Sequence, residues 1–379
     1  MPSSLAEHLL AIQQVDVLCD DMRVGTLARS AHGATTFEYA PEWLDRGFSI
    51  SPSSLPLREG SFETKPEMQD DLFGAFHDSV PDDWGRLLQD RRLAELGVSF
   101  GTLTGLARLA LVGSRGLGAL EYVPSQPIGA HGDVDRDWDL ISQQCQDILD
   151  GEESEALDSI YAWGSTTGGA RPKVMVDLEG EPWIIKFPSS IDGPDVGAEE
   201  YRLMQAARAC GIKVSETRLI PSRVCGGYFA TKRFDRTTGG DGAMRKIHMA
   251  SAAALFELSP IDVLDYRDLM LMTLDLTGDA SDCEQLFRVM CFNVAVGNLD
   301  DHARNFSYLH EGGAWRLSPA YDLTRDEGCL GGHATLVNGK GKDITRDDLL
   351  VVGAAGEISA SRCRELLRQV EEVLGESLA

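Results

Sequence analysis

Short stretches of alternating apolar and polar residues mark the strands that this chain should form. Near the N-terminus, two such stretches flank Asp20-Asp21 and predict a hairpin. Further along, a turn at Glu179-Gly180 separates two more, which predict strands over 173–177 and 183–187. Two strands are also expected around Gly226-Gly227, which would form a two-residue hairpin turn. The pattern thus places β-structure in the first two thirds of the chain.

Helical spacing of apolar residues occurs between these strands and dominates the last third of the chain. The segment AEEYRLMQAARACGIKV (198–214) places apolar side chains on one helical face and ends near Gly211, a typical C-cap. A helical region is also expected from Asp70 to Leu96. From 245 onward most of the chain has the helical pattern, including a helix capped by Ser281 or Asp282 and an amphipathic terminal helix.

The order of these elements predicts the fold class. A glycine-rich loop (164–169) precedes the strand pair, and a helix, a hairpin and a long helical region follow it. That is the layout of a two-lobed phosphotransferase. We therefore expect an α+β, protein-kinase-like fold with a β-rich N-terminal domain over 1–125, a kinase N-lobe over 126–243 and an all-helical C-lobe over 244–379. The acidic, turn-rich stretch 129–140 would lie at the first boundary.

Composition narrows the function classes. The 379 residues exceed one ordinary core, which favours more than one domain. Thirty-five basic and 60 acidic residues give a net charge of −25, which argues against unaided binding to nucleic acid or an anionic membrane. The eight cysteines form no CxxC pair, so a disulfide framework or a zinc site is not expected. Without an apolar run of about 20 residues or a signal peptide, a cytoplasmic location is expected.

The strongest chemical signal is NLDDHARNFS, which follows a long apolar helix. Asp300 and Asn305 have the D-x-x-x-x-N spacing of a kinase catalytic loop, in which the Asp handles the substrate hydroxyl proton and the Asn holds Mg²⁺. Asp322 follows 17 residues after Asn305 and would supply the second hard oxygen ligand that Mg²⁺ requires. This segment therefore predicts a phosphoryl-transfer site.

A second set of residues could bind nucleotide phosphates. Lys186 lies on the second strand after the glycine loop, where a phosphate-binding lysine would stand. Lys173 could add charge beside the loop, whose glycines and backbone N–H groups suit phosphate oxygens. Glu199 or Glu200 opens the next helix and could orient Lys186.

Each of these features alone has an ordinary structural interpretation. The glycine loop could be a plain turn, Lys186 an exposed strand residue, and Asp300 a helix cap. His302 more often serves as a structural hydrogen-bonding residue in such a loop than as a base. Their occurrence in the correct order on the correct element types favours the kinase interpretation. The sequence contains no HExxH or GxSxG motif.

With these motifs in view, the chain resembles the HipA family of serine/threonine kinases, the toxins of bacterial toxin–antitoxin modules. The resemblance covers nearly the whole chain. RVGTLARSAHGATTFEYAPEWL, SLPLREG and VPDDWGRLL resemble the N-terminal domain of the family. GGARPKVMV, WIIKFPS, EEYRLM, TKRFDR, NLDDHARNFS and LSPAYDL resemble its kinase core in order.

The resemblance implies roles for individual residues. Asp300 would be catalytic, Asn305 and Asp322 would bind Mg²⁺, and Glu200 would orient a helix. The residues implied in ATP binding are Gly168, Gly169, Ala170, Arg171, Lys173, Lys186, Lys232, Phe234, His302 and Tyr321. Lys232 to Phe234 would form the hinge beside adenine. The loop hydroxyls would be autophosphorylation candidates, with Thr166 first and Ser165 and Thr167 beside it.

The resemblance also implies cofactors and partners, namely ATP, Mg²⁺, a protein substrate and a small helix-turn-helix antitoxin similar to HipB. The substrate would belong to translation, as an aminoacyl-tRNA synthetase does, and DNA would be reached only through the antitoxin. The sequence departs from the family at ARPK in the loop and at Lys232. Two alternatives stay open: a small-molecule phosphotransferase, and a non-catalytic scaffold for a DNA-binding partner.

Overall fold

The computed structural model describes residues 4–126, 128, 136–152, 157–240, 242–259, 262–325 and 331–377. These residues divide into two units. The first comprises Met1–Gly197, Leu219–Ala250 and Ala254–Ser259, and the second comprises Ala198–Arg218, Ser251–Ala253 and Pro260–Ala379. The acidic boundary predicted at 129–140 lies largely outside the described residues. The division into three domains stays a prediction.

The first unit begins with an antiparallel sheet in the order β4-β3-β2-β1-β5. Its strands are β1 (Gln14–Cys19), β2 (Met22–Arg29), β3 (Thr35–Tyr39), β4 (Ser61–Glu63) and β5 (Glu121–Val123). The hairpin predicted at Asp20-Asp21 is confirmed, because both residues have positive φ, 48° and 61°, as a tight two-residue turn demands. Phe37, at the centre of β3, is fully buried against Phe76.

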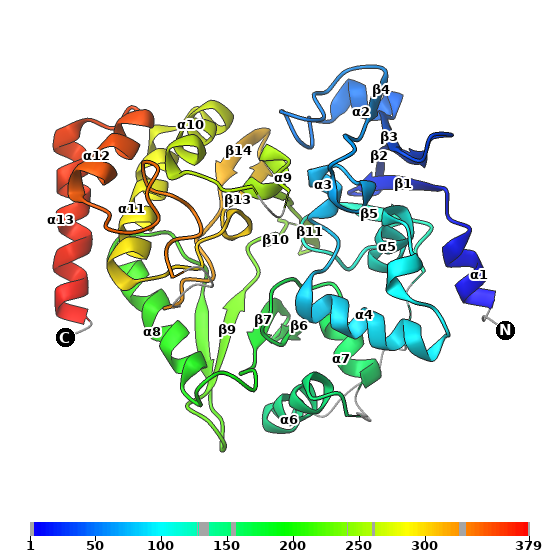
Figure 1. The fold of residues 1–379 in the computed structure, drawn as a ribbon, viewed down its shortest axis with the longest axis horizontal. Coiled ribbons are helices and arrows are strands. Elements are labelled where there is room, and N and C mark those ends of the chain that lie inside the picture. Colours follow the sequence, from blue (N-terminus) through cyan, green and yellow to red (C-terminus); the bar gives the residue numbers. More distant parts are fainter. Residues whose placement is uncertain are drawn as a thin grey trace. The chain divides into compact units, whose positions relative to one another are not determined.

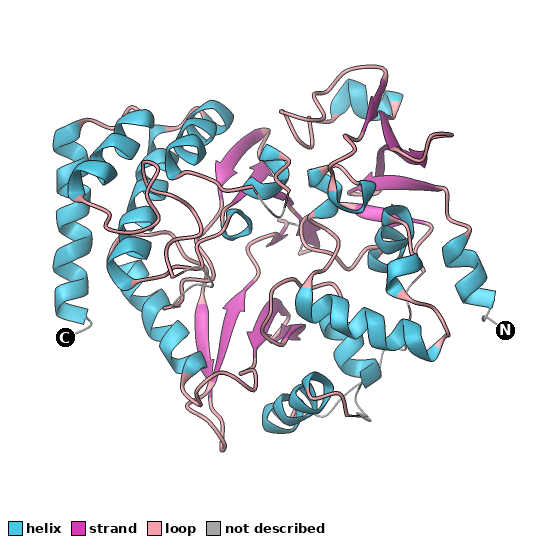
Figure 2. Ribbon diagram, in the orientation of Figure 1, coloured by secondary structure: helices cyan, strands magenta, loops and turns pink. Residues whose placement is uncertain are grey.

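Helices and short 3₁₀ turns accompany this sheet (Figure 2). They are α1 (Ser4–Leu10), α2 (Pro41–Arg46), η1 (Gln69–Asp71), α3 (Gly74–His77), α4 (Asp83–Glu95), η2 (Phe100–Thr102) and α5 (Gly105–Val112). The helical region expected from Asp70 to Leu96 is therefore interrupted. Pro81 explains the break, because the residue before a proline is driven out of the helical conformation.

A second sheet has the order β6-β7-β9-β8, and all of its strands except the first half of β8 belong to the first unit. Its strands are β6 (Lys173–Leu178), β7 (Glu181–Lys186), β9 (Tyr228–Lys232) and β8 (Thr217–Ile220), and α6 (Trp138–Leu149) and α7 (Leu157–Gly164) precede it. The strands predicted over 173–177 and 183–187 are confirmed to within two residues. At their turn, Glu179 and Gly180 have positive φ, 59° and 84°.

The two-residue turn predicted at Gly226-Gly227 is wrong. β8 ends at Ile220 and β9 begins at Tyr228, so residues 221–227 connect them. Pro221 lacks the N–H group that would continue the strand ladder. Asp139 then holds the connection, because its carboxylate accepts hydrogen bonds from Ser222 Oγ at 2.6 Å and from Arg223 Nε at 2.7 Å.

Packed helices form the core of the second unit. They are α8 (Val196–Ala209), which starts in the first unit, α10 (Tyr266–Thr277), α11 (Ala280–Val296), α12 (Arg346–Ala355) and α13 (Ala360–Ser377). Figure 1 shows α10, α11, α12 and α13 lying side by side. The remaining elements of the chain are β10 (Arg236–Thr238), β11 (Met244–Lys246), β12 (His248–Ser251), α9 (Ala252–Phe256), η3 (Ala303–Asn305), β13 (Ser307–Glu311) and β14 (Ala314–Leu317).

Two details of the expected C-terminal region require correction. It is not all helical, because β13 and β14 form a hairpin through Gly312-Gly313, both at positive φ. The cap of α11 is Asp279 rather than Ser281 or Asp282, since the Asp279 carboxylate accepts the Ser281 N–H at 2.8 Å. Among the described helices, none is both long enough and apolar enough to span a membrane.

Candidate active site

The predicted glycine loop connects α7 to β6, and its hydroxyl groups are buried. Ser165, Thr166 and Thr167 are at most 6% exposed. Thr166 Oγ1 donates to Arg115 O at 2.9 Å, and Thr167 Oγ1 donates to Gly164 O at 2.6 Å. The three candidate phosphorylation sites therefore point into the protein in this conformation of the loop.

Two lysines lie directly opposite each other where β6 and β7 meet the loop. Lys173 is the first residue of β6 and pairs in register with Lys186, the last residue of β7. Directly opposed residues of an antiparallel pair project from the same face, and like charges placed so are unfavourable. The pair therefore places two cationic side chains on one face of the strands, beside the loop. Lys173 is buried and Lys186 is half-buried, with its Nζ 5.4 Å from the ring centroid of Phe229.

Arg171, the other basic residue of the loop, and Lys232 of the predicted hinge each bind a carboxylate within the protein. The guanidinium of Arg171 binds the Asp192 carboxylate, with Nη2 to Oδ1 at 3.0 Å and Nε to Oδ2 at 3.1 Å. Lys232 Nζ lies 2.5 Å from Glu181 Oε1. Both cations therefore have carboxylate partners within the protein, while the half-buried Phe234 follows the end of β9 as predicted.

A buried ion cluster lies next to the hinge. Asp235 is 2% exposed and pairs with Arg233 and Arg236, with each closest contact at 2.7 Å. Its carboxylate also accepts the Gly118 N–H at 2.7 Å. Burial raises the pKa of this carboxyl, but the two guanidinium groups outweigh burial and hold the net pKa below its ordinary value. The cluster joins the segment after β9 to the segment before β5.

Of the two glutamates that could orient a lysine, Glu200 is the buried one. It lies in the first half of α8 and is 3% exposed, whereas Glu199 is exposed. A buried carboxylate requires a partner to offset its desolvation, which favours Glu200 for a structural or functional role.

The predicted catalytic loop follows α11, in the second unit. Gly297 ends the helix at φ 72°, and residues 298–306 lead into β13. The Asp300 side chain is 54% exposed, and its Oδ1 lies 4.0 Å from Nε2 of His302. Asn305 Nδ2 donates to the Asp300 main-chain oxygen at 2.8 Å, so the D-x-x-x-x-N spacing closes a short hydrogen-bonded loop. An exposed carboxylate on an internally braced loop is suited to receive a substrate hydroxyl.

The sequence did not reveal the structural role of Asp301, which supports the loop from inside the protein. Its side chain is fully buried: Oδ2 accepts from Tyr266 OH and lies 2.9 Å from His333 Nδ1, and Oδ1 accepts from Thr335 N at 3.2 Å. Burial and then the Asp301 charge raise the pKa of Tyr266 well above its ordinary value. Asp301 thereby ties the predicted catalytic loop to α10 and to the segment around 333–335. The acidic pair Asp300-Asp301 was the available signal, but it also fitted a helix cap.

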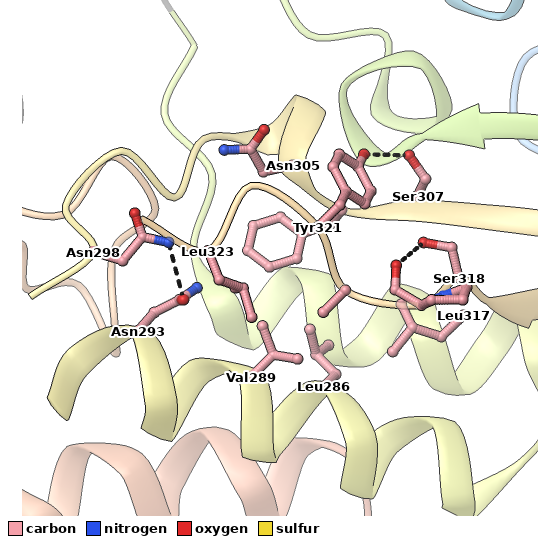
Figure 3. A pocket seen from close by; sticks show the side chains of 13 residues that line it. Leu286, Val289, Asn293, Asn298, Asn305, Ser307, Leu317, Ser318, Tyr321 and Leu323 are labelled. Atoms are coloured by element: carbon pink, nitrogen blue, oxygen red, sulfur yellow. Dashed lines mark hydrogen bonds between the residues drawn. The ribbon is translucent and has the colours of Figure 1, made fainter. Parts of the chain in front are cut away.

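Tyr321 joins the predicted metal-binding segment to the predicted catalytic loop. Its hydroxyl donates to Arg304 O at 2.6 Å and lies 2.6 Å from Ser307 Oγ (Figure 3). Asp322 follows with φ 52°, a left-handed conformation that is uncommon for residues other than glycine and often occurs at functional sites. Asn305 and Tyr321 line the same small cavity, which lies against α11.

Asn305 and Asp322 fit Mg²⁺ by their chemistry. The amide nitrogen of Asn305 is used by Asp300 O, which leaves its oxygen as the atom for a metal. In the part of the chain that the structure describes, no cluster of three or more His, Cys, Asp or Glu side chains could hold a metal by itself. Mg²⁺ in phosphotransferases needs no such cluster, because one or two side chains and the substrate phosphates hold it. These two residues belong to the second unit, and Lys173 and Lys186 belong to the first.

Comparisons with known proteins agree with the resemblance in the motifs. A family model described as the HipA N-terminal domain matches residues 15–123, and one described as the HipA-like C-terminal domain matches residues 165–377. The chain is 25% identical over 354 residues to Y4mE of Sinorhizobium fredii, which carries a provisional kinase name, covering 83% of this chain and 77% of Y4mE. It is 23% identical over 339 residues to the serine/threonine-protein kinase toxin HipA of Shewanella oneidensis. This match covers 80% of this chain and 73% of that HipA.

The fold is similar to that of a protein of known structure. A chain in the complex of Shewanella oneidensis HipA, HipB and operator DNA matches with a TM-score of 0.70 and 17% identity. The match covers 96% of this chain and 90% of that chain. The expected α+β fold, with a β-rich N-terminal region and a mostly helical C-terminal part, is confirmed by this likeness.

Proposed function

The chain belongs to the HipA-like family, and from this premise we propose that it is a serine/threonine protein kinase that uses ATP and Mg²⁺. The observation that carries the proposal is the geometry of residues 298–306. Asp300 presents an exposed carboxylate, Asn305 braces its main chain, and Asp301 anchors the loop from within. This arrangement combines a reactive group with a rigid support, as phosphoryl transfer requires.

In this mechanism the protein positions the reactants and neutralises charge. Asp300 would accept a hydrogen bond from the substrate hydroxyl, orient its oxygen toward the γ-phosphate and take up its proton late in the transfer. Lys186 and Lys173, which lie opposite each other beside the loop, would bind the ATP phosphates through their ammonium groups. Mg²⁺, held by Asn305 and Asp322, would supply further positive charge to the phosphates.

The assignment of the remaining nucleotide contacts is also a proposal. The backbone of Gly168 to Lys173 would wrap the phosphates, while Lys232 to Phe234 would border the adenine. Arg171 and Lys232 would contribute mainly through their main chains, since Asp192 and Glu181 engage their side chains. His302 and Tyr321 would border the nucleotide near the catalytic loop.

We also propose that the loop hydroxyls regulate the enzyme. Phosphorylation of Thr166, or of Ser165 or Thr167, would add nearly two negative charges to a buried position. Because the Thr166 hydroxyl is bonded to Arg115 O, the loop would first have to leave its present position. A modified loop could not return, which would remove the phosphate-binding glycines from the nucleotide.

The proposed acceptor is a protein of translation, such as an aminoacyl-tRNA synthetase, and the proposed partner is a small helix-turn-helix antitoxin similar to HipB. A matching chain comes from a complex of HipA, HipB and operator DNA, which supports the partner. The net charge of −25 suits a basic protein of that kind. DNA would be contacted only through the antitoxin.

Transfer of labelled phosphate tests the proposal. The purified protein is incubated with γ-labelled Mg-ATP and a bacterial extract, beside Asp300→Asn, and proteins are separated from metabolites. We expect label on serine or threonine of a protein with the wild type and none with Asp300→Asn. Label confined to a small molecule would replace the proposal with a small-molecule phosphotransferase. Equal labelling by Asp300→Asn would refute the role of Asp300.

A further inference from the structure

The N-terminus of α4 and the glycine loop cap each other. Asp82 occupies the N-cap position of α4, yet its carboxylate makes no capping hydrogen bond within its own helix. Its Oδ1 instead accepts the N–H of Gly169 at 2.5 Å. In return, the Trp84 N–H donates to Gly169 O at 3.3 Å. An N-cap aspartate normally satisfies its own helix, so this exchange ties the first turn of α4 to one glycine of the loop.

Further contacts extend the support along the loop. Trp84 Nε1 donates to Lys173 O, and Gln89 Nε2 donates to Ser165 O, each at 3.0 Å. Both side chains are buried, so water does not compete for these bonds. Gly85 allows the close approach, because a Cβ there would stand 2.2 Å from Thr167 O. Helix α4 lies beside α7, which leads into the loop (Figure 1).

The support comes from outside the kinase part of the chain. Residues 82–89 fall within the match to the N-terminal family model, whereas the loop falls within the match to the C-terminal one. Gly169 has φ 85°, a conformation that a free glycine loop leaves readily. A loop held in its binding conformation pays less entropy when a ligand arrives. A fixed acceptor for the Gly169 N–H therefore favours phosphate binding by the rest of the loop.

We propose that Asp82 is a positioning residue for the nucleotide, holding Gly169 in the conformation in which the loop receives the ATP phosphates. The Asp82 charge need not repel those phosphates, because a cation lies at the same glycine. A Cβ added to Gly169 would stand 2.6 Å from Lys173 Nζ. This inference rests on the proposed function, since it takes the loop to be the phosphate site.

Two substitutions separate positioning from charge. Asp82→Ala removes the acceptor, and Asp82→Asn removes the charge but keeps an acceptor oxygen. Asp90→Asn is the control, since it removes the same charge from α4 at a carboxylate that lies 3.9 Å from Arg86. We expect Asp82→Ala to weaken Mg-ATP binding in calorimetry between about twofold and thirtyfold, the range of an N-cap deletion. Asp82→Asn and Asp90→Asn should remain within about twofold of the wild type.

The other outcomes overturn the inference. Unchanged affinity in Asp82→Ala, equal weakening by both Asp82 substitutions, or tighter binding by both would each exclude hydrogen-bonded positioning. Amide hydrogen exchange in residues 165–173 provides a reading without nucleotide, and it should accelerate in Asp82→Ala and recover in Asp82→Asn. If the wild type binds no Mg-ATP, the proposed function fails. Amide hydrogen exchange in residues 165–173 would then still decide whether Asp82 holds the glycine loop.

Discussion

Replacing Asp301 by asparagine should destabilise the second unit without touching the proposed reacting atoms. The carboxylate is fully buried and receives the hydroxyl of Tyr266 and the N–H of Thr335, with His333 Nδ1 at 2.9 Å from Oδ2. An asparagine keeps one acceptor oxygen and turns the other position into a donor. The contacts to one oxygen are then lost or must rearrange.

The magnitude follows from the number and kind of bonds lost. Hydrogen bonds to a charged group contribute about 1.5–3 kcal/mol each, and removing one partner of a buried charged pair costs about 3–5 kcal/mol. Two contacts meet Oδ2 of Asp301, so we expect a loss of about 3 kcal/mol. That is a large part of the roughly 5–15 kcal/mol that stabilises a typical protein.

The neighbouring residue provides the matched control. Asp300 has the same side chain one position earlier but is 54% exposed. We therefore expect Asp300→Asn to abolish transfer with nearly unchanged stability, and Asp301→Asn to shift the unfolding transition of the second unit. Urea unfolding followed by hydrogen exchange in residues 331–337 would measure the difference. Equal stability of the two variants would show that the buried contacts of the Asp301 carboxylate do not stabilise the second unit.

The remaining predictions concern the metal, the ion cluster and the helix beside the loop. Asp322→Asn should weaken ATP binding in the presence of Mg²⁺ but not in EDTA, and calorimetry showing equal weakening under both conditions would contradict a metal ligand. The folded-state pKa of Asp235 is lowered, so its stabilisation is complete above the unfolded-state pKa of about 4 and disappears as the pH falls toward the lower folded value. Unfolding midpoints from pH 7 to pH 3 should fall less steeply in Asp235→Asn, and an unchanged slope would argue against the cluster as the cause. Gly85→Ala should destabilise the first unit by about 1–3 kcal/mol although alanine favours helices, because its Cβ would meet Thr167 O; a stability equal to or above that of the wild type in urea unfolding would show that the contact relaxes.

Local chemistry explains which parts of the fold could be predicted from the sequence. The strand pair β6 and β7 was predictable because its apolar alternation and the positive-φ turn at Glu179-Gly180 specify the same register. The two-residue turn predicted at Gly226-Gly227 was wrong for a physical reason. A glycine pair fits a two-residue turn, but Pro221 ends β8 earlier and Asp139, more than 80 residues away in sequence, holds the connection.

The candidate site shows the same limit. The spacing of Asp300 and Asn305 predicted a kinase catalytic loop, but not the hydrogen bond from Asn305 Nδ2 to the Asp300 main-chain oxygen. The support of that loop was not predictable, because Asp301 reaches partners 32 and 35 positions away. The contact between Asp82 and Gly169 spans 87 positions, and no local pattern distinguishes it from an ordinary helix cap. Sequence patterns specify local elements, whereas partners distant in the chain depend on tertiary packing.

The intact mass of the purified protein before and after Mg-ATP, beside Asp300→Asn, tests the kinase proposal most directly. We predict that only the wild type gains the mass of a phosphoryl group, or already carries it, and that the modification maps to residues 165–167. Absence of any phosphoryl mass, together with no calorimetric binding of Mg-ATP, would contradict the kinase proposal and favour a non-catalytic scaffold.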